Sequence, residues 1–252
     1  MTLGETLGEK YIEDVFVGNV SPGQVSTNFV DALLRTLGYD RAHGNRIAGW
    51  RFVECSANVS SGRNEIVEKF LESPAEWLIQ IDSDMVWAPD AVHRLLEAAD
   101  PVERPIVGGL CFAQEGDTGR IWPTMFDLGG TEDNVEFLRY DEWPDGEVMP
   151  VGSTGAAFLL THRSVLETIR DRNFSKAYPW FQEREIGGKR SGEDVSFCLR
   201  AAAVGAKVHV HTGVHVGHIK RHIVTVEGYR AQRAMLAQRE YLAAAYPEEY
   251  EK

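Results

Sequence analysis

Two aspartates separated by a single serine, Asp82 and Asp84, stand directly after a mainly apolar run at residues 77–81. Such a run, bounded by polar residues, is typical of a buried strand. In open α/β sheets, ligands bind at the carboxyl ends of the strands. A carboxylate pair at that edge can hold a divalent metal ion, and the ion can hold a phosphate. One alternative stays open, because aspartates also close strands as ordinary turn residues.

A glycine pair and an acidic pair later in the chain are also suited to binding or catalysis. Gly152 and Gly155 precede an apolar strand-like run, where glycine lets the backbone approach a ligand closely or simply turn. Glu193 and Asp194 open an expected helix. The helix dipole stabilises such carboxylates by about 0.3–1 kcal/mol, so helix capping alone would explain them. Asp194 also follows a charged loop, where a base could meet a substrate.

Two histidines, His215 and His218, fall in a strand-like segment rather than on the face of a helix. An isolated histidine is usually structural, but one that closes a strand is a better metal-ligand candidate, because neutral imidazole suits Mn²⁺ and other transition metals. The sequence contains no G-x-G-x-x-G, G-x-x-x-x-G-K-[ST], G-x-S-x-G or H-E-x-x-H motif. Dinucleotide-binding, P-loop, α/β-hydrolase and zinc-protease chemistry are therefore disfavoured.

Alternating strand and helix signals indicate how these residues are positioned. Strands are expected over residues 15–17, 51–55, 77–81, 106–112 and 156–160, with later strand-like pieces at 208–211 and 214–218. Helices are expected over residues 25–37, 64–71, 89–99, 164–170, 191–203 and 227–246. This alternation predicts an α/β fold with a mainly parallel sheet flanked by helices. Residues 114–150 are rich in Gly, Asp, Glu and Pro, so a small antiparallel insertion is expected there.

The composition is that of an ordinary globular protein. The 252 residues are 43% hydrophobic and 25% charged, and the formal net charge is −12. This charge argues against a broad electrostatic grip on nucleic acid. The three cysteines are spread far apart, which indicates neither a disulfide framework nor a structural zinc site. With no signal peptide and no membrane-spanning segment recognisable, we expect a cytoplasmic protein.

Taken in order, these motifs resemble metal-dependent glycosyltransferases of the GT-A fold, and most closely the family 2-like enzymes of bacteria and their phages. The resemblance covers roughly residues 12–222. The residues that carry it are Ser61-Gly-Arg-Asn64, Trp77 to Met85, Pro89-Asp90, Gly152 to Gly155, Tyr178-Pro-Trp-Phe181, Gly192-Glu-Asp194 and Gly217-His218. It implies one Rossmann-like GT-A domain over residues 1–252. A nucleotide-sugar half would span residues 12–113, an acceptor and catalytic half residues 114–222, and a C-terminal helix residues 227–246.

The resemblance implies a role for each matched acidic residue. Asp84 would contact the metal directly, and Asp82 would contact the ribose or a metal-bound water. His218 would complete the metal shell. Asp194 would be the general base of an inverting enzyme, with Glu193 beside it.

The same resemblance implies where the nucleotide sugar and acceptor bind. The segment from Val17 to Gln24, which includes Gly18, would hold the nucleotide together with Arg63 and Asn64. Gly155 would let the backbone approach the donor. Trp180 matches the aromatic residue of the acceptor loop, although a role as a hydrophobic lid is an equal alternative.

The implied reaction moves a sugar from a nucleotide-diphosphate sugar, expected to be a UDP-sugar, to an acceptor hydroxyl. Mn²⁺ or Mg²⁺ would assist, and one imidazole ligand favours Mn²⁺. A phage or bacterial protein, a glycan, a small molecule and a modified DNA base stay open as acceptors, as does an inverting or retaining outcome. One rival is a sugar-1-phosphate nucleotidyltransferase, although residues 18–28 lack its basic residues. A non-catalytic nucleotide-sugar-binding module is the other.

Overall fold

The computed structural model describes residues 14–55, 58–114, 119–131, 134–186, 189–220 and 225–245. The chain divides into two compact units, Met1–Ile219 and Lys220–Lys252. The larger unit holds the acidic, glycine and histidine motifs singled out in the sequence. Whether it separates into a donor half and an acceptor half near residue 113 stays a prediction.

A nine-stranded sheet forms the centre of the larger unit. Its strands are β1 (Val15–Ser21), β2 (Ile47–Glu54), β3 (Trp77–Asp82), β4 (Met85–Trp87), β5 (Ile106–Gln114), β6 (Ile121–Pro123), β9 (Val148–Val151), β11 (Phe158–His162) and β14 (Val208–His218). The main order is β2-β1-β3-β11-β5-β14-β4. β1, β2, β3, β5 and β14 run in one direction, and β11 is reversed between β3 and β5. The expected α/β class, with the long strands parallel, is confirmed.

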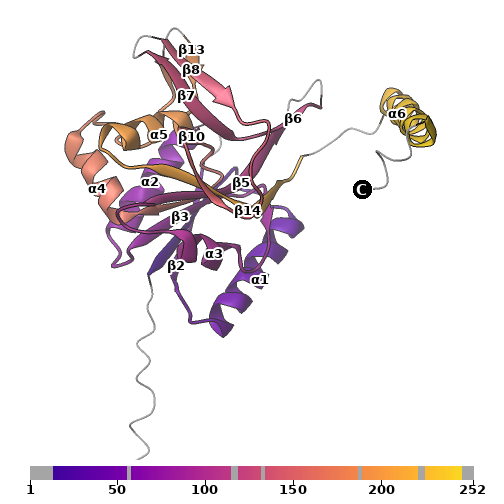
Figure 1. The fold of residues 1–252 in the computed structure, drawn as a ribbon. Helices are drawn as coiled ribbons and strands as arrows, with labels where there is room; N and C mark the ends of the chain where they lie inside the picture. Colours follow the sequence, from indigo (N-terminus) through magenta and orange to yellow (C-terminus); the bar gives the residue numbers. More distant parts are fainter. Residues whose placement is uncertain are drawn as a thin grey trace, which may run out of the picture. The chain divides into compact units, whose positions relative to one another are not determined.

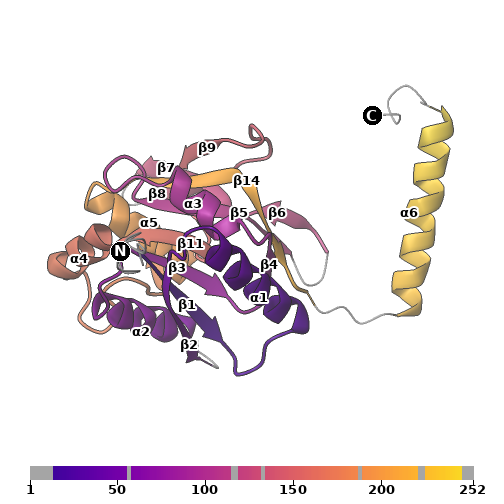
Figure 2. The same cartoon turned by 90° about the horizontal axis from the view of Figure 1, so that it is seen from below.

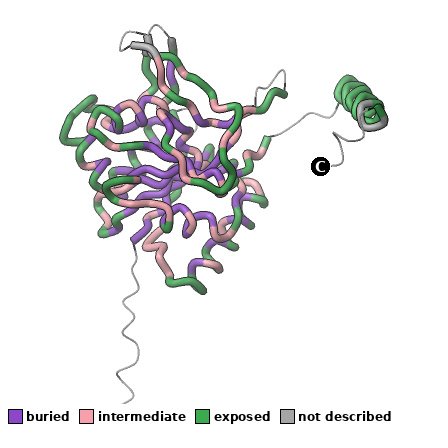
Figure 3. The backbone as a smooth tube through the Cα atoms, in the orientation of Figure 1, coloured by how far each residue is buried: buried purple, intermediate pink, exposed green. Residues whose placement is uncertain are grey.

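Helices cover both faces of this sheet (Figures 1 and 2). They are α1 (Thr27–Ala42), α2 (Val59–Leu71), α3 (Ala91–Ala98), α4 (Arg163–Arg172) and α5 (Glu193–Ala203). α2, α4 and α5 pack into one hydrophobic core, and α1 and α3 pack into the other. Successive strand residues point to opposite faces, so Leu78 joins the first core while Ile79 joins the second. Figure 3 shows this buried backbone running along the central strands.

The start of α2 lies earlier than the sequence pattern indicates. The helix begins at Val59, five residues before the expected start at residue 64. The Asn58 side chain accepts a hydrogen bond from the Ser61 amide at 3.0 Å. This N-cap satisfies one of the free amides of the first turn, and it places Arg63 within the helix.

The expected antiparallel insertion is present, and the strand-like pattern at residues 135–140 corresponds to one of its strands. β7 (Met125–Thr131) pairs with β8 (Asn134–Arg139) and with the short β10 (Ser153–Thr154). The β7–β8 hairpin stands above the central sheet in Figure 1. A second hairpin, β12 (Arg184–Ile186) and β13 (Lys189–Ser191), lies in the charged segment before α5. The two late strand-like pieces form one strand, β14, with a register shift between His211 and His215.

The smaller unit contains the expected C-terminal helix, α6 (Val226–Ala245). Every α6 side chain whose burial the structure describes is exposed. Within the described residues, no helix is both long and apolar enough to cross a bilayer.

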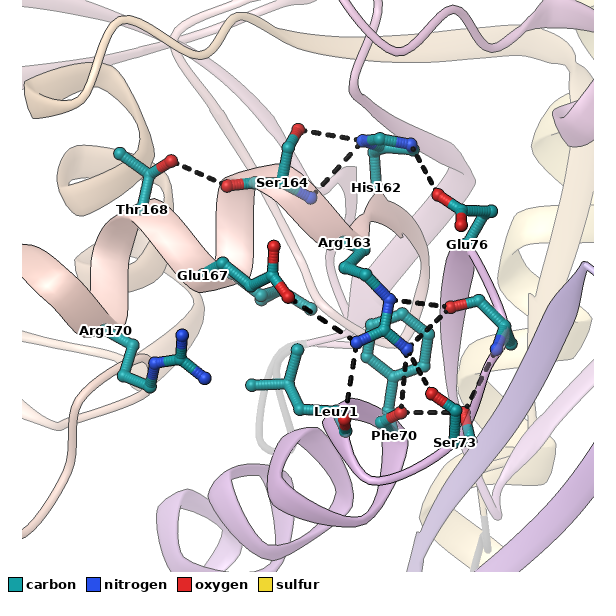
Figure 4. Close-up of polar contacts among 12 residues, drawn as sticks. Phe70, Leu71, Ser73, Glu76, His162, Arg163, Ser164, Glu167, Thr168 and Arg170 are labelled. Atoms are coloured by element: carbon teal, nitrogen blue, oxygen red, sulfur yellow. Dashed lines mark hydrogen bonds and ion pairs between the residues drawn. The ribbon is translucent and has the colours of Figure 1, made fainter.

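Arg163, a half-buried arginine, links the start of α4 to the end of α2 (Figure 4). Its guanidinium donates hydrogen bonds to the carbonyl oxygens of Phe70, Leu71, Ser73 and Ala75. All four carbonyl groups lie at the end of α2 or in the turn that follows it. An arginine at this position also interacts favourably with the negative end of the helix dipole. This clamp fixes the turn from which β3 runs toward Asp82.

We expect Arg163→Ala to lower the free energy of unfolding by about 2–4 kcal/mol, because several half-buried carbonyls lose their donor together. Arg163→Lys is expected to recover only part of the loss, since an ammonium cannot match the planar fork of a guanidinium. Urea denaturation measures both. Glu167→Gln is the matched control, because the Arg163–Glu167 pair is long, at 3.6 Å, and half-exposed. Equal stability of Arg163→Ala and Glu167→Gln would contradict the clamp.

Candidate active site

The acidic motif and the late histidine meet at the carboxyl edge of the sheet. Asp82 is the last residue of β3, and Asp84 lies in the turn between β3 and β4. β4 pairs with β14 in the antiparallel direction, with Met85 opposite His218. This pairing brings Asp84 and His218 together, although 134 residues separate them in the sequence.

The imidazole of His218 lies between a backbone carbonyl and the carboxylate of Asp84. Nδ1 is 3.0 Å from the carbonyl oxygen of Phe112, and Nε2 is 2.9 Å from Oδ2 of Asp84. A carbonyl oxygen can only accept, so Nδ1 carries the proton that is donated to Phe112. Such a bond fixes the ring so that Nε2 faces a metal or an acid partner.

The spacing of Asp84 and His218 is that of an ordinary hydrogen bond and is also compatible with two ligands of one divalent metal ion. Two neighbouring ligands, each about 2.1 Å from an octahedral ion, lie about 3.0 Å apart, close to the 2.9 Å between Nε2 and Oδ2. The described residues contain no group of three or more His, Cys, Asp or Glu side chains arranged around a metal. The remaining ligands would then be phosphate oxygens and water, which is how Mg²⁺ is commonly bound at nucleotide sites.

A buried arginine, Arg63 of α2, connects the two acidic motifs. Its Nη2 donates to Asp82 Oδ2 at 3.0 Å and its Nε donates to Glu193 Oε1 at 3.1 Å. Nη1 donates to Gln80 Oε1 at 3.2 Å and to the Ala156 carbonyl at 3.1 Å. The Arg63 side chain is only 4% exposed. In this arrangement the guanidinium positions Asp82 and Glu193, and it does not reach a surface on which a nucleotide could lie.

The charges around Arg63 shift one another's pKa values. Burial alone would lower the pKa of Arg63, but Asp82 and Glu193 raise it above its usual value. Burial raises the pKa of Asp82, which Arg63 opposes. One oxygen of Asp82, Oδ1, lies 2.9 Å from Arg63 as an ion pair but makes no hydrogen bond among the described residues. That oxygen is itself buried, so in this conformation its partner is the guanidinium of Arg63.

The candidate base, Asp194, lies in the first turn of α5. Its Oδ1 accepts a hydrogen bond from the Val195 amide at 2.7 Å. Burial, followed by the neighbouring charge of Glu193, raises the pKa of Asp194 to about 6. A carboxylate with that pKa is ionised at neutral pH and is still a useful acceptor for a proton.

Two glycines lie beside Asp194, and one of them, Gly192, gives its side chain room. A Cβ on Gly192 would lie 2.7 Å from Oδ1 of Asp194, which is too close, and one on Gly155 would lie 3.7 Å from Oδ2. Gly155 therefore borders the side chain of Asp194. The sequence associated Gly155 with the donor, and the structure places it beside the candidate base.

Asn64 and Trp180 have structural partners. The Asn64 side-chain amide donates to the carbonyls of Ser60 and Phe181, and its oxygen accepts from the Trp180 amide at 3.1 Å. Trp180 is 2% exposed, and its indole nitrogen donates to the Leu166 carbonyl. Both side chains are thus engaged in the core, and neither presents a surface to a nucleotide or an acceptor in this conformation.

Val17 and Gly18 lie inside a strand rather than in a loop. β1 continues to Ser21, so the loop that the sequence placed after residue 17 begins four residues later. Val17 is fully buried. A Cβ on Gly18 would lie 2.2 Å from Cγ2 of Ile66, so this glycine allows α2 to pack against β1. Within the segment 17–24, only the residues from Ser21 onward lie at the carboxyl edge of the sheet.

Two residues of the site were not indicated by motif reasoning. Gln80 was a polar residue inside an otherwise apolar strand, and this irregularity was the signal that it has a buried partner. The carbonyl of Phe112 orients His218. A backbone group carries no side-chain signal, so no sequence pattern could have identified that contact.

No protein-family model and no curated protein matches the chain. Among solved structures, A197 from STIV is similar over 82% of this chain and 86% of its own, with 15% identity and a TM-score of 0.50. GalNAc-T7, solved with UDP, GalNAc and Mn²⁺, is similar over 87% of this chain, with 13% identity and a TM-score of 0.55. TarS 1-349 from S. aureus, solved with UDP-GlcNAc, covers 84% of this chain and 60% of its own at 13% identity, with a TM-score of 0.46.

These similarities extend over different shares of the other proteins. The chain spans 45% of the GalNAc-T7 chain and most of A197. At such low identities a structural likeness shows the fold alone. The likeness to GalNAc-T7 shows that this chain has a GT-A-like fold, the class expected from its sequence.

Proposed function

We propose that the chain is a metal-dependent glycosyltransferase that uses a nucleotide-diphosphate sugar, with UDP as the expected nucleotide. The observation that carries the proposal is the approach of Asp84 to His218 at the carboxyl edge of the sheet, at 2.9 Å. The GT-A-like fold supports it, since GalNAc-T7 of similar fold was solved with UDP, GalNAc and Mn²⁺. The acceptor and the sugar are further questions.

In this proposal Asp84 and His218 hold a divalent ion, preferably Mn²⁺ because one ligand is an imidazole. When bound, the ion supplies Lewis-acid stabilisation of the leaving diphosphate. Asp82 stays paired with the buried Arg63 and would position the turn that carries Asp84. Glu193 stays fixed on Arg63, which keeps the start of α5 in place.

Asp194 is the proposed general base. An acceptor hydroxyl is a weak nucleophile until a positioned group takes its proton. With a pKa of about 6, Asp194 is mainly ionised at pH 7 and can accept this proton at Oδ2, since Oδ1 already accepts from the Val195 amide. Transfer would then proceed with inversion at the anomeric carbon.

The proposal is tested by measuring UDP release from UDP-glucose, UDP-galactose, UDP-N-acetylglucosamine and UDP-N-acetylgalactosamine, each with Mn²⁺ and with excess chelator. We expect slow hydrolysis of at least one donor, dependent on Mn²⁺, because water can replace the acceptor. Pyrophosphate release from UTP and a sugar 1-phosphate, without UDP release from any donor, would contradict glycosyl transfer and indicate a nucleotidyltransferase.

A further inference from the structure

A pocket of about 320 Å³ lies between the start of α2 and the segment before α5. We call it the α2 pocket. Its polar lining residues are Asn58, Ser60, Tyr178, Gln182, Glu183 and Arg190. Val59 is the apolar member of the lining. Pockets of this volume are typical for small ligands, but most binding pockets are lined mainly by apolar groups, and this one offers chiefly amides and hydroxyls.

The charges in the α2 pocket balance. Glu183 and Arg190 form an ion pair with each other, and the other lining side chains are neutral. An anionic ligand would meet Glu183 as well as Arg190, so the lining has no net charge that would attract it. A neutral ligand with many hydroxyl groups could instead use both members of the pair as they stand, one as acceptor and the other as donor.

One wall of the pocket is held by a buried arginine. Arg200 of α5 is 2% exposed and donates to the carbonyls of Tyr178 and Pro179 and to Oε1 of Gln182. Burial lowers the pKa of Arg200 to about 10, so it remains a cation at neutral pH. Burying a cation against neutral partners is unfavourable by itself, and the hydrogen bonds to Tyr178, Pro179 and Gln182 offset part of this cost.

The same wall is held from the other side by Asn64, which bonds the backbone of Trp180 and Phe181. The Tyr178 hydroxyl accepts a hydrogen bond from the Asn58 side chain at 3.1 Å, which closes the rim of the pocket. Tyr178 and Gln182 therefore stand in fixed positions before any ligand binds, and preorganisation of this kind favours affinity.

Two lining residues of the α2 pocket lie close in the sequence to residues of the candidate active site. Ser60 lines the pocket, and one helical turn later, about 4.5 Å along the axis of α2, Arg63 binds Glu193 and Asp82. Arg190 precedes Glu193 by only three residues. The pocket lining is thus continuous in the chain with the helix turn that carries Arg63 and with the segment that leads into α5.

We propose that the α2 pocket binds a neutral sugar residue of the acceptor, so that the acceptor is a carbohydrate or a glycan-bearing molecule. This inference rests on the proposed glycosyl transfer and assigns its substrate class. The amides of Asn58 and Gln182, the hydroxyl of Tyr178 and the Glu183–Arg190 pair would hydrogen-bond the hydroxyl groups of the sugar. The reactive hydroxyl would point toward Asp194.

The test uses saturation-transfer NMR on the full chain with UDP and diamagnetic Mg²⁺ present, because paramagnetic Mn²⁺ would broaden the ligand signals. The probes are methyl glycosides of glucose, galactose, mannose, N-acetylglucosamine and N-acetylgalactosamine, with glucuronic acid and glucose 6-phosphate as charged counterparts. We expect at least one neutral glycoside to bind, and Tyr178→Phe and Gln182→Ala to weaken it by about three- to tenfold each, as for loss of one hydrogen bond. Tyr229→Phe, at an exposed tyrosine of α6, is the matched control and should bind like the wild type.

Three results would overturn the inference: no binding of any neutral glycoside, binding of the charged sugars only, or binding that Tyr178→Phe and Gln182→Ala leave unchanged. Calorimetry of UDP with Mn²⁺ on the same proteins separates this failure from that of the proposed function. If the wild type binds UDP but no glycoside, the pocket assignment fails alone. If it does not bind UDP, the proposed function fails, and glycoside binding still decides the pocket.

Discussion

Asp194→Asn is expected to lower turnover by about 10²–10⁴-fold, the usual contribution of a general base, while UDP still binds in the presence of Mn²⁺. Asparagine keeps the shape of the side chain and can still accept from the Val195 amide, but it cannot take up a proton. UDP release from the UDP-sugar that the wild type hydrolyses with Mn²⁺ measures the effect. Asp171→Asn, at an exposed carboxylate of α4, is the matched control.

The pH dependence provides a second measure of this prediction. Wild-type turnover should rise with pH through about 6, because Asp194 must be ionised and burial together with Glu193 raises its pKa to about 6. Because the pKa of Asp194 is higher in the folded than in the unfolded protein, protonation of Asp194 favours the folded state. This contribution to stability is complete below the unfolded-state pKa of about 4 and is lost as the pH rises through 6. At pH 8, Asp194→Asn should therefore be more stable than the wild type, by no more than about 3 kcal/mol in the free energy of unfolding. At pH 4 the two proteins should be equally stable. Full turnover of Asp194→Asn would contradict the assignment.

Asp84→Ala is expected to remove the metal-dependent part of UDP binding, with a loss of affinity of about 100-fold or more, as expected when one of two protein ligands to a metal is lost. A ligand that binds only the folded state raises the melting temperature, so the rise caused by UDP with Mn²⁺ should vanish in this variant. Asp31→Ala, at an exposed residue of α1, is the matched control.

His218→Ala distinguishes metal binding from a purely structural Asp84–His218 contact. If both residues hold the ion, both variants should lose the Mn²⁺-dependent rise in melting temperature while keeping most of their stability without ligand. A variant Asp84→Ala that still shows the full rise would exclude this carboxylate from metal binding.

The layered fold was predictable because its signals are local. Apolar strands such as residues 77–81 and the helix at residues 164–170 follow patterns that burial on a sheet or a helix face imposes. β9 was not predictable, because its sequence Val-Met-Pro-Val lies in a segment rich in turn-forming residues and becomes a strand only by pairing with β14. The continuous β14 likewise depends on partners that are distant in the sequence.

The residues of the candidate site also divide into those whose importance the sequence indicated and those whose surroundings it could not indicate. Asp82, Asp84, Asp194 and His218 were recognisable because each stands at the end or the start of an element, where side chains reach a ligand. Their roles stay predictions. The roles suggested for Arg63 and Trp180 came from motif order, which does not indicate how deeply a side chain is buried. Arg63 became a buried link between Asp82 and Glu193 because five donors can satisfy several acceptors at once.

Isothermal calorimetry of UDP with the wild-type protein, first in Mn²⁺ and then in excess chelator, tests whether the protein binds a nucleoside diphosphate through a metal ion. Metal-dependent binding of a nucleoside diphosphate at Asp84 and His218 predicts a measurable affinity with Mn²⁺ and a fall of at least about 100-fold when the ion is removed. UDP binding of equal strength in both conditions, or no binding in either, would contradict the account.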